Sequence, residues 1–351
     1  MTAKNALILE DGKFIIREGP IPEPGPGEVV VKVAACGICG TDLNLFIGKR
    51  PRGWKISFPF QMGHELSGVI QAVGAGVPDE PGLRIGDRVV QDGRLPCGHC
   101  RYCRRGHENL CINQGYTAGG FAQYAVYPYQ NLLTVPDNVD LVEAAFAEPL
   151  ACCINGNNKL ANVPLGGFGV VIGAGPIGLL HVQLLKSRGL QVIAIDLQEN
   201  RLDVARSLGA KHVIKARKSY EADDALIDRV IELSGGFGAD VVVTAAGLDP
   251  SVLEEALAMS AKQGQILYFA ATLSDPVTLN LDVIHYKELA LIGTHDSTRA
   301  DYEKALAMMQ SGNMDLSPII SHRYPLEEIY DAFDFARQRK GLKVMVVNEG
   351  F

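Results

Sequence analysis

A glycine-rich motif in the middle of the chain constrains the fold most strongly. The apolar run Phe168–Ile172 leads into GAGPIG at residues 173–178, and an amphipathic helical pattern follows. A strand, a tight glycine turn and a helix in this order form the context in which G-x-G-x-x-G binds a dinucleotide, because free N–H groups at the helix start face the phosphates. The motif therefore predicts a dinucleotide site. Its predicted residues are Gly173, Gly175, Pro176, Ile177 and Gly178.

The identity of the nucleotide is indicated by the next apolar strand. Gln191–Ile195 ends at Asp196, where a carboxylate can accept from both ribose hydroxyls of NAD and would repel the extra phosphate of NADP. The neighbouring Leu197 offers no compensating cation, and Arg201 is interpreted as a contact on the adenosine side. NAD is therefore the predicted cofactor.

Strand and helix patterns alternate from residue 168 to residue 293. Such repeats predict a doubly wound parallel sheet that is covered by helices on both faces. In these sheets ligands bind outside the carboxyl ends of the strands. Four further cofactor contacts are predicted there, although core packing is an equally good interpretation for each one singly. They are Thr244, Ala246, Phe269 and Ala270.

Four cysteines form a second pattern, C-x2-C-x2-C-x7-C. Four thiolates can close a tetrahedral shell around zinc, and the polar or flexible residues between them would be ordered by the metal. Two disulfides, or an iron–sulfur cluster, are the minor alternatives. His99 and His107 lie in the same loop and are interpreted as solvated. The pattern predicts a closed metal site made of Cys97, Cys100, Cys103 and Cys111.

A third group of residues offers mixed metal ligands. CGICGTD at residues 36–42 follows the apolar run Val29–Ala35, which predicts a strand, and GHE at 63–65 and EP at 148–149 come later. One thiolate, one imidazole and one or two carboxylates are the donor set of a catalytic zinc. A β-barrel with incidental polar residues is the alternative, as is an ordinary helix carboxylate for the EP motif. The candidate ligands are Cys36 or Cys39, His64, Glu65 and Glu148.

Composition excludes several classes of function. The net charge of the 351 residues is -7 and no basic block stands out, which argues against a nucleic-acid partner. No apolar run approaches the ~18 residues that span a membrane, and the N-terminus shows no signal-peptide pattern. We therefore expect a cytoplasmic protein, in which the eight cysteines are mostly reduced and favour metal ligation over disulfides.

The order of these patterns predicts three segments. Residues 1–152 are expected to form a β-rich domain that carries the cysteine lobe at 94–114. Residues 153–294 are expected to form the dinucleotide-binding domain. Residues 295–351 are expected to return to the first domain, because a β-rich domain needs covering helices and the parallel sheet is already complete. This tail is predicted to contain helices at Arg299–Gln310 and Leu326–Lys340 and a final strand at Leu342–Val347.

Taken together, CGICGTD, GHE, the four-cysteine lobe, EP and GAGPIG resemble the zinc-containing medium-chain dehydrogenase/reductases, in the branch of sorbitol and threonine dehydrogenases. The resemblance covers essentially the whole chain. It implies a GroES-like catalytic domain formed by both chain ends, with a Rossmann domain inserted between them and the active site in the cleft. It also implies two zinc ions per chain, one catalytic and one structural, and assembly into homotetramers or homodimers.

The resemblance also implies residue roles. Cys39 matches the thiolate ligand of the catalytic zinc, which leaves Cys36 as a packing residue, and His64 matches the imidazole ligand. Glu65 or Glu148 supplies a carboxylate, and the resemblance leaves open which of them contacts the ion. Thr41 matches the hydroxyl that passes the alcohol proton onward. The four cysteines of the lobe match the ligands of the structural zinc.

Two departures from the family pattern bear on the substrate. Many relatives carry histidine three residues after the relay hydroxyl, where this chain has Asn44, which cannot accept a proton at neutral pH. Polyol dehydrogenases carry an Arg–aromatic pair soon after the last strand of the parallel sheet, where this chain has GTHDS at residues 293–297. The expected substrate pocket draws on Asn44, Phe46, Trp54, Phe58, Phe121, His295 and Asp296.

The function that the resemblance implies is reversible hydride transfer from a polar secondary alcohol, of the polyol or cyclitol type, to NAD. One alternative is a threonine-type amino-alcohol dehydrogenase, in which Asp296 could hold the substrate ammonium. The other is a zinc- and NAD-binding sensor that has lost catalysis, which intact Cys39, Thr41 and His64 argue against. The expected partner in either enzyme is a small alcohol or ketone.

Overall fold

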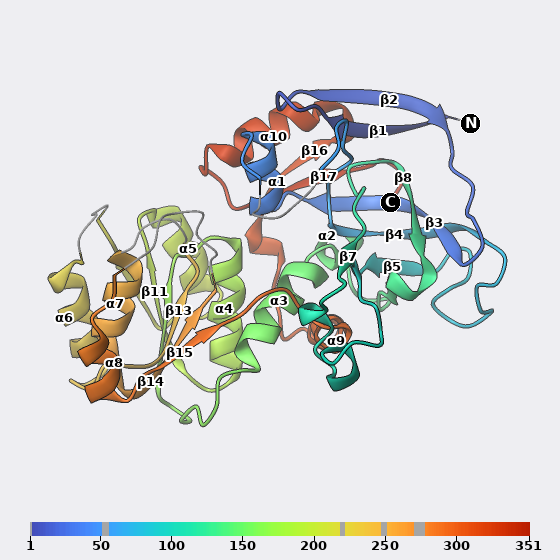
Figure 1. Cartoon of the computed structure of the whole chain (residues 1–351). Coiled ribbons are helices and arrows are strands. Elements are labelled where there is room, and N and C mark those ends of the chain that lie inside the picture. Colours follow the sequence, from blue (N-terminus) through green and yellow to red (C-terminus); the bar gives the residue numbers. More distant parts are fainter. Residues whose placement is uncertain (1, 51–55, 218–221, 247–250, 270–277) are drawn as a thin grey trace. The chain divides into compact units, whose positions relative to one another are not determined.

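The computed structural model describes residues 2–50, 56–217, 222–246, 251–269 and 278–351 (Figure 1). The chain forms two compact units, each with its own sheet and core. The terminal unit consists of Met1–Ala151 and Ser297–Phe351, and the central unit consists of Cys152–Asp296. Among the described residues, no helix is both long enough and apolar enough to cross a bilayer.

Strand β3 (Glu28–Gly37) is the centre of the terminal unit. It is buried along almost its whole length, as its apolar run predicts for a strand covered on both faces. One edge pairs with β4, and the other edge pairs with β8 in its first half and with β17 at its end. The sheet order is β16-β17-β3-β4-β5-β9. Its further strands are β4 (Glu65–Val73), β5 (Arg88–Gln91), β8 (Tyr124–Pro128), β9 (Leu132–Thr134), β16 (Ile320–Pro325) and β17 (Lys343–Val347).

An aromatic cluster joins the two ends of the chain in the core of the terminal unit. Phe333 on α10 (Ile329–Arg337) has its ring centroid 4.8 Å from that of Phe14, 5.4 Å from that of Phe46 and 5.3 Å from that of Phe121. The C-terminal helix thus covers the N-terminal strands. The other elements of this unit include β1 (Thr2–Ile8), β2 (Phe14–Pro20), α1 (Gly40–Phe46), α2 (Leu141–Ala144) and α9 (Arg299–Gln310).

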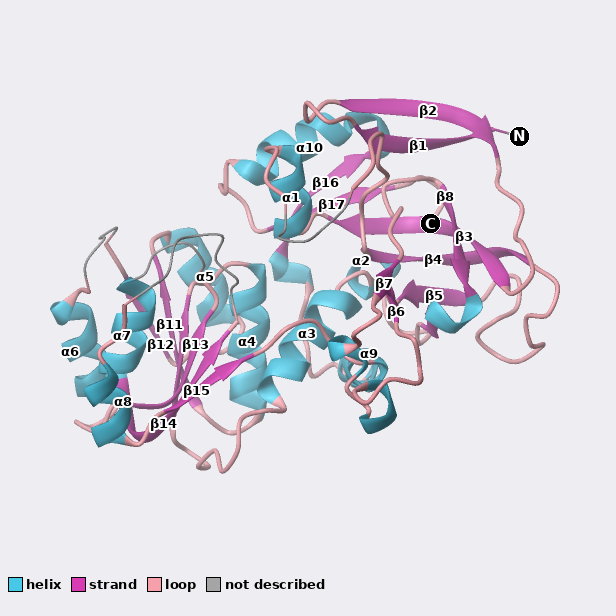
Figure 2. Ribbon diagram, viewed as in Figure 1, coloured by secondary structure: helices cyan, strands magenta, loops and turns pink. Residues whose placement is uncertain are grey.

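The central unit contains a six-stranded sheet whose strands are all parallel, in the order β12-β11-β10-β13-β14-β15. The predicted doubly wound sheet is confirmed, and Figure 2 shows α4 and α5 on one face and α6, α7 and α8 on the other. The strands are β10 (Phe168–Ile172), β11 (Gln191–Asp196), β12 (His212–Lys215), β13 (Ala239–Thr244), β14 (Ser260–Tyr268) and β15 (Ala290–Gly293). The helices are α4 (Pro176–Ser187), α5 (Glu199–Ser207), α6 (Asp224–Leu233), α7 (Ser251–Met259) and α8 (Leu281–Lys287). Helix α3 (Ala147–Asn157) begins in the terminal unit and ends in the central unit.

The tail differs from the prediction in two details. Strand β16 lies before the last helix and pairs in parallel with β17. Its residues are mostly exposed and polar, so the sequence contains no apolar run that would predict this strand. The predicted helix Leu326–Lys340 is a 3-10 turn at Leu326–Glu328 followed by α10, which ends at Arg337.

Candidate metal centres and nucleotide site

Two strands and the start of a helix form the first candidate metal site. Strand β3 ends at Gly37, and Cys39 then caps α1 with its backbone N–H donating to Oδ2 of Asp42 at 3.0 Å. His64 directly precedes β4, whose first residue is Glu65. One ligand atom each from Cys39, His64 and Glu65 lies within 4.8 Å of the others. A thiolate, an imidazole and a carboxylate at this spacing fit a catalytic zinc.

Asp42 lies beside the imidazole of this group. Its Oδ1 is 3.7 Å from Nδ1 of His64, and the carboxylate is almost fully buried. Burial alone would lower the pKa of His64, but Asp42, Cys39 and Glu148 together raise it well above its ordinary value. A carboxylate behind a histidine orients the ring and strengthens it as a metal ligand. Asp42 is the last residue of the CGICGTD motif, three residues after Cys39, but the motif alone does not indicate that its carboxylate lies beside His64.

Glu65 is buried, and its charge is met by a lysine from the far end of the chain. Oε2 of Glu65 forms an ion pair with Nζ of Lys343, the first residue of β17. Burial acts to lower the pKa of Lys343, but Glu65, Cys39 and Glu148 raise it above its ordinary value. Sequence reasoning missed Lys343, and the available signal was a charged residue at the start of an otherwise apolar final strand.

The other predicted catalytic residues lie on two helices. Glu148 is on the first turn of α3 and partly buried. It is not a member of the Cys39, His64 and Glu65 group, yet its charge acts on His64. Thr41 is partly buried on α1. Cys36 is fully buried, and Cβ atoms added at Gly63 and Gly120 would press on its sulfur.

The predicted pocket residues separate into different environments. Phe121 is fully buried in the aromatic core, so the prediction that it lines the pocket is wrong. Phe46 packs on the same core, as does Phe58, and Asn44 is partly buried on α1. Trp54 lies outside the described residues. His295 is exposed and Asp296 is partly buried, both after the last strand of the central unit.

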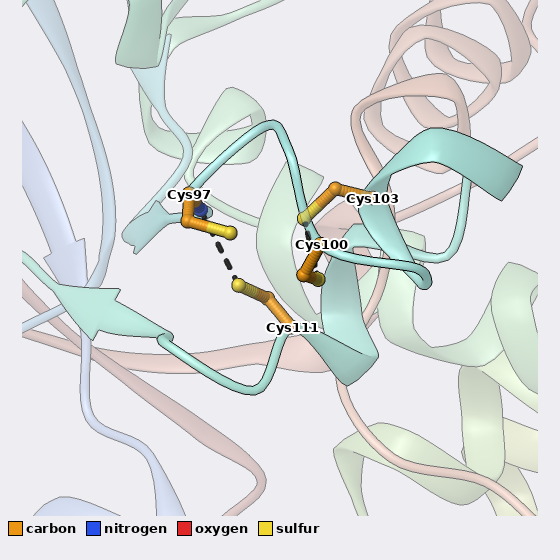
Figure 3. Close-up of side chains that lie close together, drawn as sticks. All are labelled: Cys97, Cys100, Cys103 and Cys111. Atoms are coloured by element: carbon orange, nitrogen blue, oxygen red, sulfur yellow. Dashed lines mark hydrogen bonds between the residues drawn. The ribbon is translucent and has the colours of Figure 1, made fainter.

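The four cysteines of the lobe converge as the second candidate metal site. Figure 3 shows their side chains close together, and their sulfurs lie within 4.8 Å of one another. The backbone N–H groups of Cys97 and Asn113 donate to Sγ of Cys111 at 3.3 and 3.4 Å. Backbone N–H groups, of which that of Cys103 is the strongest, lower the pKa of Cys100 to about 6. Four thiolates that receive N–H donors fit a structural zinc.

The lobe is closed by short local structure. A two-stranded ribbon, β6 (Arg94–Leu95) with β7 (Gly115–Tyr116), forms its base. A 3-10 turn at Cys103–Arg105 ends in left-handed Gly106, which returns the chain toward the last cysteine. None of the chain's eight cysteines, all of which are described, is in a disulfide.

The glycine turn of the central unit has the shape of a dinucleotide cradle. Gly173 has φ +98°, and a Cβ there would come within 2.8 Å of the backbone N of Ala246. A Cβ at Gly178 would overlap the carbonyl of Gly173. Gly175 caps α4, and Pro176 and Ile177 are the first residues of that helix. These positions leave the helix N-terminus open to a phosphate.

Asp196 supports the cradle from the next strand. Its Oδ2 accepts from the N–H of Ala174 at 2.7 Å, and its Oδ1 accepts from the N–H of Gln198 at 2.8 Å. Nη1 of Arg201 is 3.9 Å from the same carboxylate. At the end of β13, the buried Oγ1 of Thr244 has no hydrogen-bond partner among the residues that the structure describes.

Phe269 directly follows β14, so it lies at the same carboxyl edge of the sheet as these groups, whereas Ala270 lies outside the described residues. An unpartnered hydroxyl and an open glycine cradle at one edge fit a dinucleotide such as NAD.

Two family descriptions match the sequence, "Alcohol dehydrogenase GroES-like domain" over residues 25–137 and "Zinc-binding dehydrogenase" over residues 176–311. The L-threonine 3-dehydrogenase of Bacillus subtilis is 35% identical across 97% of this chain and 98% of its own length. A sorbitol dehydrogenase of Halalkalibacterium halodurans is 32% identical across 95% of this chain and 96% of its own. Among solved structures, a chain from Sinorhizobium meliloti described as a zinc-binding dehydrogenase bound to NADP has a TM-score of 0.87 and 29% identity, covering 99% of both chains.

Proposed function

As this chain belongs to the zinc-containing medium-chain dehydrogenases, we propose that it oxidises a polar secondary alcohol of the polyol or cyclitol type and transfers the hydride to NAD. The observation that carries the proposal is the convergence of Cys39, His64 and Glu65 within 4.8 Å. The four-cysteine site of the same chain has a complete set of four ligands, which suits a structural zinc. The site of Cys39, His64 and Glu65 is therefore the one that suits a catalytic zinc. The sorbitol dehydrogenase relative supports the polyol class.

Zinc held at this site would act as a Lewis acid toward a substrate hydroxyl, and NAD would accept the hydride. Oγ1 of Thr41, two residues after Cys39, accepts the hydroxyl proton and passes it outward. The alcohol thereby loses one hydride and one proton, and the products are a ketone, NADH and H⁺. Asn44 cannot take the proton onward, so the outer step uses water or another group.

For the catalytic metal we propose Cys39, His64 and Glu65 as protein ligands, with Glu148 as the second carboxylate of the site. The ion pair with Lys343 weakens Glu65 as a donor, because a carboxylate shared with an ammonium has less negative charge to give a metal. Metal analysis of Glu65→Gln and Glu148→Gln tests this assignment. The variant that loses the larger share of catalytic zinc identifies the stronger ligand.

A threonine-type amino-alcohol dehydrogenase is the second candidate. The 35% identity to the L-threonine 3-dehydrogenase of Bacillus subtilis favours it. In this version the carboxylate of Asp296 would hold the substrate ammonium. The rest of the chemistry is unchanged, since threonine also carries a secondary alcohol.

The deciding experiment offers the zinc-loaded protein a panel of polyols, inositols, L-threonine and simple alcohols, with NAD and NADP side by side. We expect NADH formation with a polyol or cyclitol. Turnover of L-threonine alone would establish the second candidate. Silence across the whole panel would contradict both enzymes and favour a zinc- and NAD-binding sensor.

We propose a homo-oligomer, most simply a homotetramer, built from dimers that meet at β15. This strand ends the central sheet, and three of its four residues are exposed. The neighbouring α8 buries none of its residues, and Tyr286 on it is 76% exposed. Among the described residues no strand pairs with the outer edge of β15, and such a partly apolar edge favours pairing with a second copy. Light scattering of Ile292→Pro should then give a smaller particle than the wild type, and an unchanged mass would contradict pairing at β15.

We also propose a cytoplasmic location. Its support is that five of the eight cysteines lie in the two candidate metal sites, where zinc needs them as thiolates. Thiols that serve as metal ligands persist in a reducing compartment.

A further inference from the structure

A turn with a rare backbone conformation follows the last strand of the central unit. Asp296 has φ +56°, in the left-handed region that non-glycine residues seldom adopt. Its carbonyl oxygen accepts from Nδ2 of Asn155 at 2.6 Å. The same nitrogen lies 3.2 Å from the carbonyl of His295 and 3.4 Å from Oγ1 of Thr294. One amide therefore serves the whole turn Thr294–Asp296.

Asn155 is itself held on α3. It is 9% exposed, and its Oδ1 accepts from Nζ of Lys159 at 3.1 Å. The same ammonium donates to Oγ1 of Thr294 at 3.0 Å. Gly156 lets the helix come close, because a Cβ there would be 3.3 Å from Cγ2 of Thr294. Asn155 and Lys159 together form a clamp on the turn.

The sheet order places this turn at one end of the dinucleotide site. Asp196 ends β11, the glycine turn follows β10, and Thr244 ends β13. In the β14–β15 pairing Tyr268 is opposite Gly293, so the turn lies beside the end of β14. A dinucleotide with its adenosine at β11 and its pyrophosphate at β10 extends its nicotinamide half toward β14 and β15.

We propose that Asn155 is a positioning residue for the nicotinamide half of the cofactor, acting through the turn Thr294–Asp296. This inference rests on the proposed function, since it takes NAD as the ligand. Asn155 does not itself touch the nucleotide. It supplies the donor that keeps Asp296 in its left-handed conformation, and without this donor the turn relaxes away from the shape that meets the nicotinamide.

The test compares two ligands of the intact, zinc-loaded enzyme by calorimetry. NADH carries the nicotinamide, and ADP-ribose lacks it but keeps the adenosine and pyrophosphate. In Asn155→Ala we expect about tenfold weaker NADH binding, as for the loss of one buried hydrogen bond, with ADP-ribose binding unchanged. Asn155→Asp should behave alike, because it keeps the size and the acceptor for Lys159 but loses the donor. Asn158→Ala, at an exposed neighbouring position, is the control.

Equal weakening of NADH and ADP-ribose would overturn the inference, because it would show a general structural role. Unchanged binding of both ligands would overturn it as well. If Asn155→Ala does not fold, the same comparison can be made with two other variants. Asn155→Asp is isosteric, and Lys159→Met removes the hydrogen bond from Nζ of Lys159 to Thr294. A wild-type enzyme that binds neither ligand would instead overturn the proposed function, and this inference with it.

Discussion

Lys343 and Glu65 form a buried ion pair over Gly37, and three neighbouring strands contribute the three residues. Gly37 on β3 is opposite Glu65 on β4, and β17, on the other edge of β3, begins at Lys343. A Cβ on Gly37 would overlap Oε2 of Glu65 and lie 2.7 Å from Cε of Lys343. The last strand of the chain thus balances a carboxylate that lies beside Cys39 and His64.

The first prediction concerns this pair. Lys343→Met leaves the carboxylate of Glu65 buried without its cation, and breaking a buried pair costs about 3–5 kcal/mol. We expect that loss in the free energy of unfolding of the metal-free protein, measured in urea. The double variant Lys343→Met with Glu65→Gln should recover part of it, because no buried charge is left unpaired.

The exposed ion pair of Lys4 with Glu327 provides the matched control. Lys4→Met removes the same kind of cation, but both partners there are solvated, so we expect little change in stability. Equal effects of Lys4→Met and Lys343→Met would contradict the assigned importance of the buried pair.

The second prediction concerns the glycine beneath the pair. Gly37→Ala forces Glu65 and Lys343 apart, and overpacking of this kind costs about 1–3 kcal/mol. The added Cβ overlaps the carboxylate of Glu65 and displaces it from Cys39 and His64, so we expect lower retention of the catalytic zinc during dialysis against a chelator, with the structural zinc retained. Gly40→Ala is the control, because a Cβ there meets no atom of the described residues within 4 Å. If both alanine variants keep their zinc equally well, the close fit at Gly37 is irrelevant to the metal.

Local patterns were the part of the structure that sequence could predict. The cysteine lobe and the glycine turn each lie within a short stretch, so spacing alone indicates their geometry, and the alternating patterns predict the parallel sheet that the structure confirms. Lys343 could not be found in this way, because its partner Glu65 is joined to it only through the pairing of β3 with β4 and β17.

Side-chain environment was the part that sequence could not supply. Phe121 follows two glycines and was expected near the metal ligands. Its local sequence is equally compatible with the wall of a pocket and with a hydrophobic core. Phe121 is buried in a core cluster that includes Phe333, which comes from the other end of the chain. The role of Asn155 could not be predicted for a similar reason. Nothing in the sequence shows that its amide donates to the carbonyl of Asp296, which lies 141 residues later.

The third prediction separates the two metal sites. Cys39→Ser should abolish turnover and remove one zinc per chain while NADH binding persists, because the nucleotide residues lie on other elements. Cys100→Ser should instead destabilise the protein before it affects chemistry, since a structural zinc contributes folding free energy. Metal content, NADH titration and thermal unfolding distinguish the two. Retained activity in Cys39→Ser would refute the catalytic assignment, and a normally stable Cys100→Ser that lacks one zinc would refute the structural one.

The fourth prediction concerns nucleotide choice. Asp196→Ala removes the acid expected at the ribose and also an acceptor for the N–H of Ala174. We expect NAD to bind about tenfold more weakly, as for the loss of one buried hydrogen bond, and the preference over NADP to fall. Asp203→Ala on the exposed face of α5 is the control. An unchanged ratio of kcat/KM for the two nucleotides would show that the choice is made by other residues.

The last prediction concerns a buried histidine that the proposed chemistry does not use. His181 on α4 is fully buried, with its ring 4.7 Å from that of Phe269, and its Nδ1 lies 2.9 Å from Nδ2 of Asn157. Since the amide nitrogen donates, Nδ1 accepts and the imidazole is neutral. Burial lowers the pKa of His181 to about 3.

This shift makes stability depend on pH. The folded pKa lies below the unfolded value of about 6.5, so the unfolded chain binds the proton first as the pH falls. The contribution of His181 is therefore fully present above pH 6.5 and is lost toward pH 3, at about 1.4 kcal/mol per pH unit. His181→Phe keeps a ring against Phe269 but cannot bind a proton. We expect its unfolding free energy to fall less steeply than that of the wild type between pH 6 and pH 4. His285→Phe, at an exposed position, controls for the substitution, and parallel curves for wild type and His181→Phe would show that the buried imidazole does not govern acid stability.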